Sequence, residues 1–157
     1  MKTDIGISDK NRQEVVGILN TILSDEYLLY TKTRNFHWNV TGPNFSELHK
    51  LFEAQYNELN IIVDDTAERA RSLGGRALGT LTEFLKNTTL KESPGVYPDA
   101  KKMLSSLLAD HQAIIQKLRK GLADCAEKYQ DMGTSDFLTG LMEQHEKMAW
   151  MLRAYLS

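Results

Sequence analysis

Long stretches without helix-breaking residues constrain the fold of this chain more than any other feature of its sequence. Only three prolines occur in 157 residues, at positions 43, 94 and 98, and proline is the residue that most strongly interrupts a helix. Between them, apolar residues mostly recur at spacings of three and four, the period of an amphipathic α-helix. The sequence therefore predicts an all-α protein built from a few long helices.

Four long helices are expected from this pattern. They cover residues 8–37, 43 to 71 or 73, 97–129, and 134 or 135 to the end. Ser8 or Asp9 is the expected cap of the first helix, and Thr134 or Ser135 that of the fourth. Pro43 suits the first turn of the second helix, where the missing N–H would have had no partner.

The connections between these helices predict the topology. A short link joins helices one and two, and another joins helices three and four, so each pair is expected to form an antiparallel hairpin. The connection over 74–97 is much longer and contains a short helix, signalled by the capping-box spacing of Thr80 and Glu83. A segment of this length can travel the height of the bundle and leave helices two and three parallel. We expect one domain over 1–157, a ferritin-like four-helix bundle with a long crossover.

Composition excludes several classes of protein. With 41% apolar residues the chain can bury one core, and 19 basic against 21 acidic residues give a net charge of -2. This balance argues against a disordered polyelectrolyte and against a strongly basic nucleic-acid binder. The sequence has neither a long apolar run nor a hydrophobic segment within 1–9, so no membrane span or secretion signal is expected. The single Cys125 fits a cytoplasmic protein and is expected to be a small core residue.

Four polar residues of the predicted second helix point to metal chemistry. His49, Glu53, Asp64 and Glu68 project from about one quarter of its surface, at about 100° per residue. His49 and Glu53 form one i,i+4 pair, and Asp64 and Glu68 another, a spacing at which two side chains can hold one ion. The two pairs lie about 22 Å apart along the helix, so they cannot share an ion within one chain.

A second copy of the chain would resolve this separation. If two copies of the helix packed antiparallel about a two-fold axis near Glu58 and Leu59, each His49/Glu53 end would face an Asp64/Glu68 end of the partner. His37, at the end of helix one, is the natural third ligand of the first end. Such a mixed site with open positions suits iron, with zinc or manganese as competitors.

Plainer interpretations stay open at this point. Charged residues at i,i+4 spacing usually form a solvated helix face. His111 and His145 are assigned to the surface or to satisfied packing, and the methionines, including Met148 and Met151, to the core. Trp38 and Trp150 are expected to be packing residues.

Two segments carry a resemblance to a known family. The stretch HWNVTGPNFSELHKLFE at 37–53, followed by DDTAER at 64–69, resembles the signature of the Dps family, the mini-ferritins named as DNA-binding proteins from starved cells. The resemblance implies a hollow homododecamer that oxidises Fe(II), preferentially with hydrogen peroxide. It also implies storage of ferric oxide, protection against oxidative stress, and a ferroxidase site between two subunits.

The resemblance also implies roles for individual residues. One subunit would contribute His37, His49 and Glu53, although the family commonly has Asp at the last position, and its two-fold mate would contribute Asp64 and Glu68. Trp38 resembles a family tryptophan beside the iron site that donates an electron during peroxide reduction.

Several alternatives accompany this assignment. No histidine here follows a glutamate by three residues, which disfavours a di-iron site within one bundle. A DNA-compacting or structural dodecamer with weak or no ferroxidase activity is the rival function. Resemblance places Asp131 and Asp136 in acidic rings around a three-fold iron pore, against a simple role at a helix N-terminus.

Direct DNA binding is not expected near neutral pH. Non-specific duplex binding needs several cationic contacts with phosphates. Before and at the start of helix one, Lys2, Lys10 and Arg12 stand against Asp4 and Asp9. Twelve copies could multiply a weak contact, and acid or magnesium could reduce repulsion.

Overall fold

The computed structural model describes residues 3–157 and is all-helical over that range. Its elements are α1 (Asp9–Asn39), α2 (Phe45–Ser72), α3 (Leu81–Asn87), α4 (Ala100–Glu127) and α5 (Met132–Leu156). The four long helices and the short one correspond to those predicted from the sequence. None of the helices in the described part is long and apolar enough to cross a membrane.

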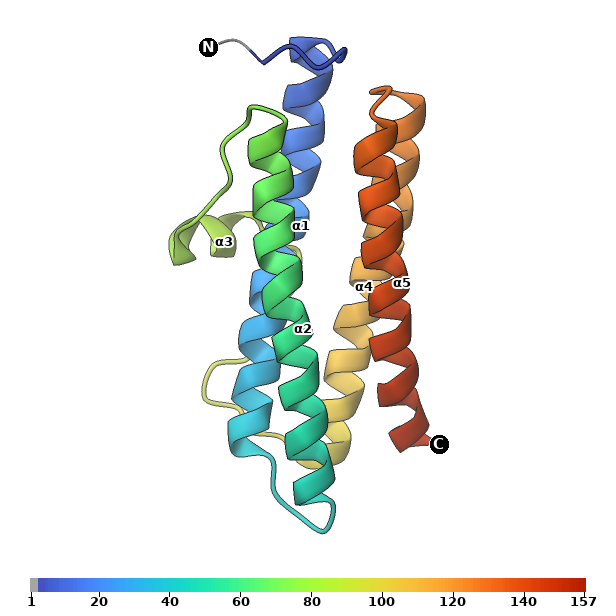
Figure 1. Cartoon of the computed structure of the whole chain (residues 1–157). Coiled ribbons are helices and arrows are strands. Elements are labelled where there is room, and N and C mark those ends of the chain that lie inside the picture. Colours follow the sequence, from blue (N-terminus) through green and yellow to red (C-terminus); the bar gives the residue numbers. More distant parts are fainter. Residues whose placement is uncertain (1–2) are drawn as a thin grey trace.

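The chain folds as two antiparallel hairpins joined by the long crossover. Figure 1 shows α1 beside α2 and α4 beside α5, with the segment after α2 returning along the outside of the bundle and carrying α3 on the way. Because this segment returns to the opposite end before α4 begins, α2 and α4 run parallel. The expected one-crossover, ferritin-like topology is therefore confirmed.

Two of the predicted helix starts are confirmed by their caps. The Ser8 hydroxyl accepts a hydrogen bond from the Asn11 N–H at the start of α1 (3.2 Å). At α3 the Thr80 hydroxyl accepts from the Glu83 N–H (3.2 Å), and the Glu83 carboxylate accepts from the Thr80 N–H (3.0 Å). This reciprocal pair is the capping box that the sequence indicated.

The other three starts differ from the prediction. Helix α4 begins at Ala100, with Asp99 as its cap, rather than at residue 97. Pro43 lies outside α2, because the Phe45 N–H donates to the Gly42 carbonyl (3.1 Å) and closes a turn before the helix begins. Gly42 has φ +113°, a conformation that favours glycine in this turn. Helix α5 begins at Met132, because Asp131 is its cap, rather than Thr134 or Ser135.

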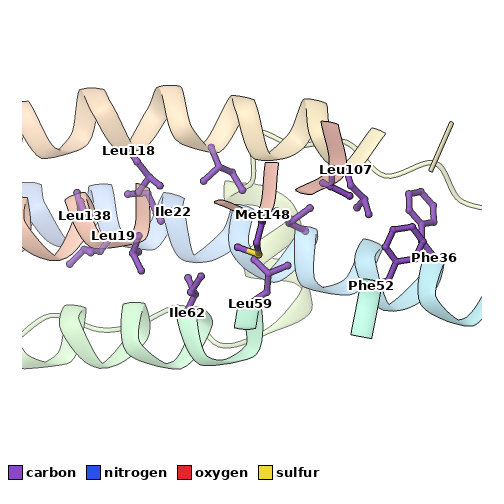
Figure 2. Packing of buried hydrophobic residues seen from close by; sticks show 14 of the residues in the cluster. Leu19, Ile22, Phe36, Phe52, Leu59, Ile62, Leu107, Leu118, Leu138 and Met148 are labelled. Atoms are coloured by element: carbon purple, nitrogen blue, oxygen red, sulfur yellow. The ribbon is translucent and has the colours of Figure 1, made fainter. Parts of the chain in front are cut away.

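The core runs the length of the bundle and draws on all four long helices. Figure 2 shows Phe36 of α1 close to Phe52 of α2, and Met148 of α5 near Leu59 of α2. Cys125 and Met148 are buried as predicted, whereas Met151 is 38% exposed. Trp38 and Trp150 are 64% and 61% exposed, so neither packs in the subunit core as the sequence pattern suggested.

The crossover is held against α1 by both apolar and charged contacts. The ring of Phe84 in α3 stacks on Tyr27 of α1, with centroids 4.4 Å apart. Asp25, which is fully buried, accepts hydrogen bonds from the Thr88 hydroxyl (2.8 Å) and the Thr89 N–H (2.6 Å), and it pairs with Lys117 of α4. These contacts fix the path that makes α2 and α4 parallel.

Candidate metal centre

Two histidines come together where α1 ends and α2 begins. His37 lies in the last turn of α1, and His49 lies in the first turns of α2. The short link between the helices brings the two rings into a stack, with centroids 3.8 Å apart and planes 20° apart. The predicted proximity of these two residues is thus present within one chain.

Each histidine is anchored on the backbone of the other. His37 Nδ1 lies 2.8 Å from the carbonyl oxygen of His49, and His49 Nδ1 lies 2.9 Å from that of His37. A carbonyl oxygen only accepts, so both Nδ1 atoms must carry a proton. In the neutral rings the lone pair is then on Nε2, and no hydrogen bond within residues 3–157 uses either Nε2. This is how a protein prepares an imidazole to bind a metal.

Aromatic side chains surround the histidine pair. The Tyr56 ring meets the His37 ring edge to face, with centroids 5.2 Å apart, and Phe45 lies 5.1 Å from the His49 ring. The Arg34 guanidinium lies over the Trp38 ring at 4.9 Å. His37 is only 7% exposed as a result. Packing therefore restricts the orientation of both imidazoles before any metal binds.

The three predicted carboxylates lie on the exposed face of α2. Glu53, Asp64 and Glu68 are all exposed, and none of them takes part in a hydrogen bond or ion pair within the described chain. Glu53 is one turn from His49, whereas Asp64 and Glu68 lie toward the C-terminal end of the same helix. These carboxylates are therefore available to a ligand or to a second subunit.

One subunit does not assemble a complete metal site. Over residues 3–157, no group of three or more His, Cys, Asp and Glu side chains is placed to hold one ion. The two oriented imidazoles and the unpaired carboxylates nevertheless offer a set of donor types suited to iron. A half-site at each end of one helix face is the arrangement that a two-fold pair of subunits would complete.

The two predicted pore residues occupy different environments. Asp131 is 2% exposed, and its carboxylate accepts from the Thr134 N–H (2.9 Å) and hydroxyl (2.5 Å) while pairing with Arg69 of α2 (3.2 Å). Within this subunit both Asp131 carboxylate oxygens already accept hydrogen bonds in the cap, which makes Asp131 the weaker of the two pore candidates. Asp136, in contrast, is exposed on the first turns of α5.

The sequence interpretation missed a second polar cluster, in the middle of the bundle. Glu26, His111 and His145 are completely buried, and they are hydrogen-bonded to one another. The histidines are thus not surface residues, and their packing leaves one ring nitrogen of His111 without a partner. A usable signal was present, since each of the three stands four residues after a core residue: Ile22, Leu107 and Leu141.

Comparison with known proteins shows extensive similarity. The family model described as a ferritin-like domain matches residues 16–157. The "Uncharacterized low temperature-induced protein" of Nostoc sp. is 46% identical over 155 residues, covering 99% of this chain and 87% of that protein. The "DNA protection during starvation protein" of Brevibacillus brevis is 38% identical over 156 residues, covering 99% of both chains.

A solved structure resembles the fold closely. The Dps protein of Vibrio cholerae O1, described as a member of a broad superfamily of ferritin-like diiron-carboxylate proteins, is 30% identical to this chain. It superimposes with a TM-score of 0.92, covering 100% of this chain and 98% of that one.

Proposed function

The chain belongs to the ferritin-like family and, within it, to the Dps proteins, and we propose that it is a ferroxidase that stores the ferric product. Its proposed site lies between two subunits, with His37, His49 and Glu53 from one and Asp64 and Glu68 from the other. The observation that carries this proposal is the reciprocal anchoring of the two histidines, which leaves both Nε2 lone pairs available.

The side chains would divide the work between binding and charge stabilisation. The two imidazoles hold ferrous iron with a fixed ring orientation, and the carboxylates of the partner subunit complete its coordination. A field of several carboxylates also favours the ferric product over the ferrous substrate. Two ferrous ions beside one hydrogen peroxide supply the two electrons that reduce it to water, so that hydroxyl radical is not released. Exposed Trp38, next to His37, is the proposed electron donor when only one ferrous ion is present.

The proposed assembly follows from the same helix. Two copies of α2 packed antiparallel would create two identical sites, and further copies would close a hollow dodecamer that stores ferric oxide and so protects against oxidative stress. We retain only Asp136 for the proposed pore, because its carboxylate is exposed while that of Asp131 is buried. A ring of such carboxylates would lower the barrier to a cation crossing the shell.

The stoichiometry of the reaction tests this function. Ferrous iron is loaded anaerobically, hydrogen peroxide is added in portions, and ferric iron is followed by absorbance while a spin trap reports hydroxyl radical. The proposal predicts roughly two irons oxidised per peroxide with little trapped radical. A ratio near one, with abundant trapped radical, would contradict the two-electron reaction.

DNA compaction is the competing function, and the relatives named for DNA protection make it worth testing. The charge balance argues against DNA compaction at neutral pH, and one of the basic residues near the start of α1 is buried and cannot reach a phosphate. Arg12 is 5% exposed, donates to the Leu73 and Ile7 carbonyls (2.7 and 3.3 Å) and pairs with Asp9. Lys10 is exposed, and Lys2 lies outside the described residues. We propose that protection of DNA comes from removal of iron and peroxide rather than from direct binding.

A mobility-shift assay on the intact assembly decides between these functions. No retardation of plasmid is expected at neutral pH and about 0.15 M salt. Retardation that more salt reverses would favour the DNA-compacting alternative.

A further inference from the structure

Three ionisable side chains are linked by hydrogen bonds in the apolar interior of the bundle. His145 Nε2 of α5 lies 2.9 Å from Glu26 Oε1 of α1, and His145 Nδ1 lies 2.9 Å from His111 Nδ1 of α4. All three residues have no exposed surface. This buried triad (Glu26, His145 and His111) joins the α1/α2 hairpin to the α4/α5 hairpin.

The hydrogen bonds of the buried triad set how many protons it can hold. Two protons suffice for the two hydrogen bonds, and with Glu26 ionised the triad then carries one negative charge. A third proton makes the triad neutral. A fourth would leave a net positive charge with no exposed surface, which is strongly unfavourable. The outer atoms, Glu26 Oε2 and His111 Nε2, have no partner that could stabilise it.

The charged side chains next to the triad in sequence and across from it are already paired in the described part of the chain. On α1 and α4, Asp25 pairs with Lys117 and Lys32 pairs with Asp110. Among the buried residues of α5, which the structure describes in full, His145 itself is the ionisable one. The buried polar side chains of α2 are those of Gln55 and Thr66, both uncharged, and the Gln55 NH₂ group donates to the Met148 carbonyl of α5 (3.1 Å).

The unfolded chain behaves differently in mild acid. Its two histidines are solvated and both become protonated below about pH 6.5, so the same three residues hold four protons. The folded triad holds at most three, and burial together with the neighbouring His145 keeps the pKa of His111 well below its usual value. A state in which the hairpins have separated and the triad is solvated, as in the unfolded chain, binds at least one more proton than the folded state. Acid therefore favours this open state.

We propose that the buried triad is a pH-sensitive latch that holds the two helical hairpins together at neutral pH and releases them in mild acid. Glu26, His111 and His145 contribute nothing to the proposed metal site, whose five residues all lie on the α1/α2 hairpin. The latch therefore stands independently of the ferroxidase proposal.

Hydrogen exchange of the assembled full-length protein tests the latch. Exchange of α4 and α5 amides is measured between about pH 7 and about pH 5 and divided by the intrinsic rate at each pH, which gives the opening constant. For the parent protein, whose folded triad takes up the third proton in mild acid, we expect this constant to rise about tenfold per pH unit below about pH 6.5, as uptake of one further proton requires.

Two variants move the response in opposite directions. Glu26→Gln cannot supply the negative charge that compensates a third proton, so its folded state stays at two protons. Its opening constant should rise more steeply, by about a hundredfold per pH unit, and from a higher pH. The combination of Glu26→Leu, His111→Leu and His145→Leu has nothing to titrate and should lose the acid response.

The matched control removes an exposed carboxylate outside the triad: Glu14→Gln should follow the parent profile. A parent opening constant that does not change with pH would overturn the proposal, and so would an unchanged slope in the triple variant. If the triple variant does not fold, Glu26→Gln decides alone, and a slope equal to the parent's would refute the latch.

Discussion

Replacing Asp131 by alanine should destabilise the subunit without slowing iron uptake. The Asp131 carboxylate is buried at the junction of α2 and α5, where it caps α5 through the Thr134 N–H and pairs with Arg69. Its replacement leaves both the first turn of α5 and the guanidinium without this partner. The variant thus separates a structural role from the pore role that sequence resemblance suggested.

The magnitude follows from these contacts. Loss of an N-cap costs about 0.5–2 kcal/mol. The ion pair adds about 1 kcal/mol, because the Asp131 side chain is 3% exposed but that of Arg69 is 27% exposed and partly screened by water. We therefore expect the free energy of unfolding to fall by about 1.5–3 kcal/mol, and Asp131→Asn, which can still accept from Thr134, to lose less.

Urea unfolding at a fixed protomer concentration measures this loss, since assembly makes the apparent stability depend on concentration. Asp136→Asn is the matched control, because Asp136 is exposed and its replacement should change stability by less than about 0.5 kcal/mol. If Asp136 lines the pore, this variant takes up iron more slowly. The reasoning fails if Asp131→Ala retains the parent stability and slows iron uptake instead.

Three further predictions concern other parts of the molecule. Burial raises the pKa of the Cys125 thiol from 9.0 to about 11, so reagents that react with the thiolate at pH 8 should label the folded protein at least about 100-fold more slowly than the urea-unfolded chain. Above pH 9 the thiol of the unfolded chain loses its proton while that of the folded chain keeps it, so the free energy of unfolding should fall as pH rises. Asp25→Ala leaves Lys117 and the Thr89 N–H without their buried acceptor, so the free energy of unfolding in urea should fall by about 3–5 kcal/mol and proteolytic cleavage within 88–97 should increase. Protease resistance equal to the parent's would refute the anchoring role of Asp25. Trp38→Phe should leave iron affinity unchanged but increase trapped hydroxyl radical when iron is below one ion per site; equal radical yields would remove Trp38 from the reaction.

The fold was largely predictable because its signals are local or periodic. Breaker-free amphipathic stretches gave the four long helices, and the spacing of Thr80 and Glu83 located α3 within the crossover. The start of α5 was harder, since Asp131, Thr134 and Ser135 are all good caps and the choice depends on tertiary contacts. Arg69, distant in sequence, pairs with Asp131 and contacts Thr134, and so favours the first of them.

The candidate site was predictable in position but not in its finer geometry. Helical spacing places His49 and Glu53 on one face of α2, and the length of the helix separates them from Asp64 and Glu68. Reciprocal anchoring of His37 and His49 involves backbone carbonyls, and no residue pattern encodes it. The buried triad was missed because ionisable residues at core positions are rare, and only the helix register shows that three of them meet.

Subunit complementation tests the shared site most directly. His49→Ala and Asp64→Ala each remove one half of the proposed site, so each variant alone should oxidise iron slowly. When equal amounts are unfolded and reassembled together, a mixed pair contains one doubly defective site and one intact site. Random pairing then restores about a quarter of the parent's fast ferroxidase activity. A mixture no more active than its two components, with normal assembly, would contradict a site shared between subunits, as would either single variant oxidising iron at the parent rate.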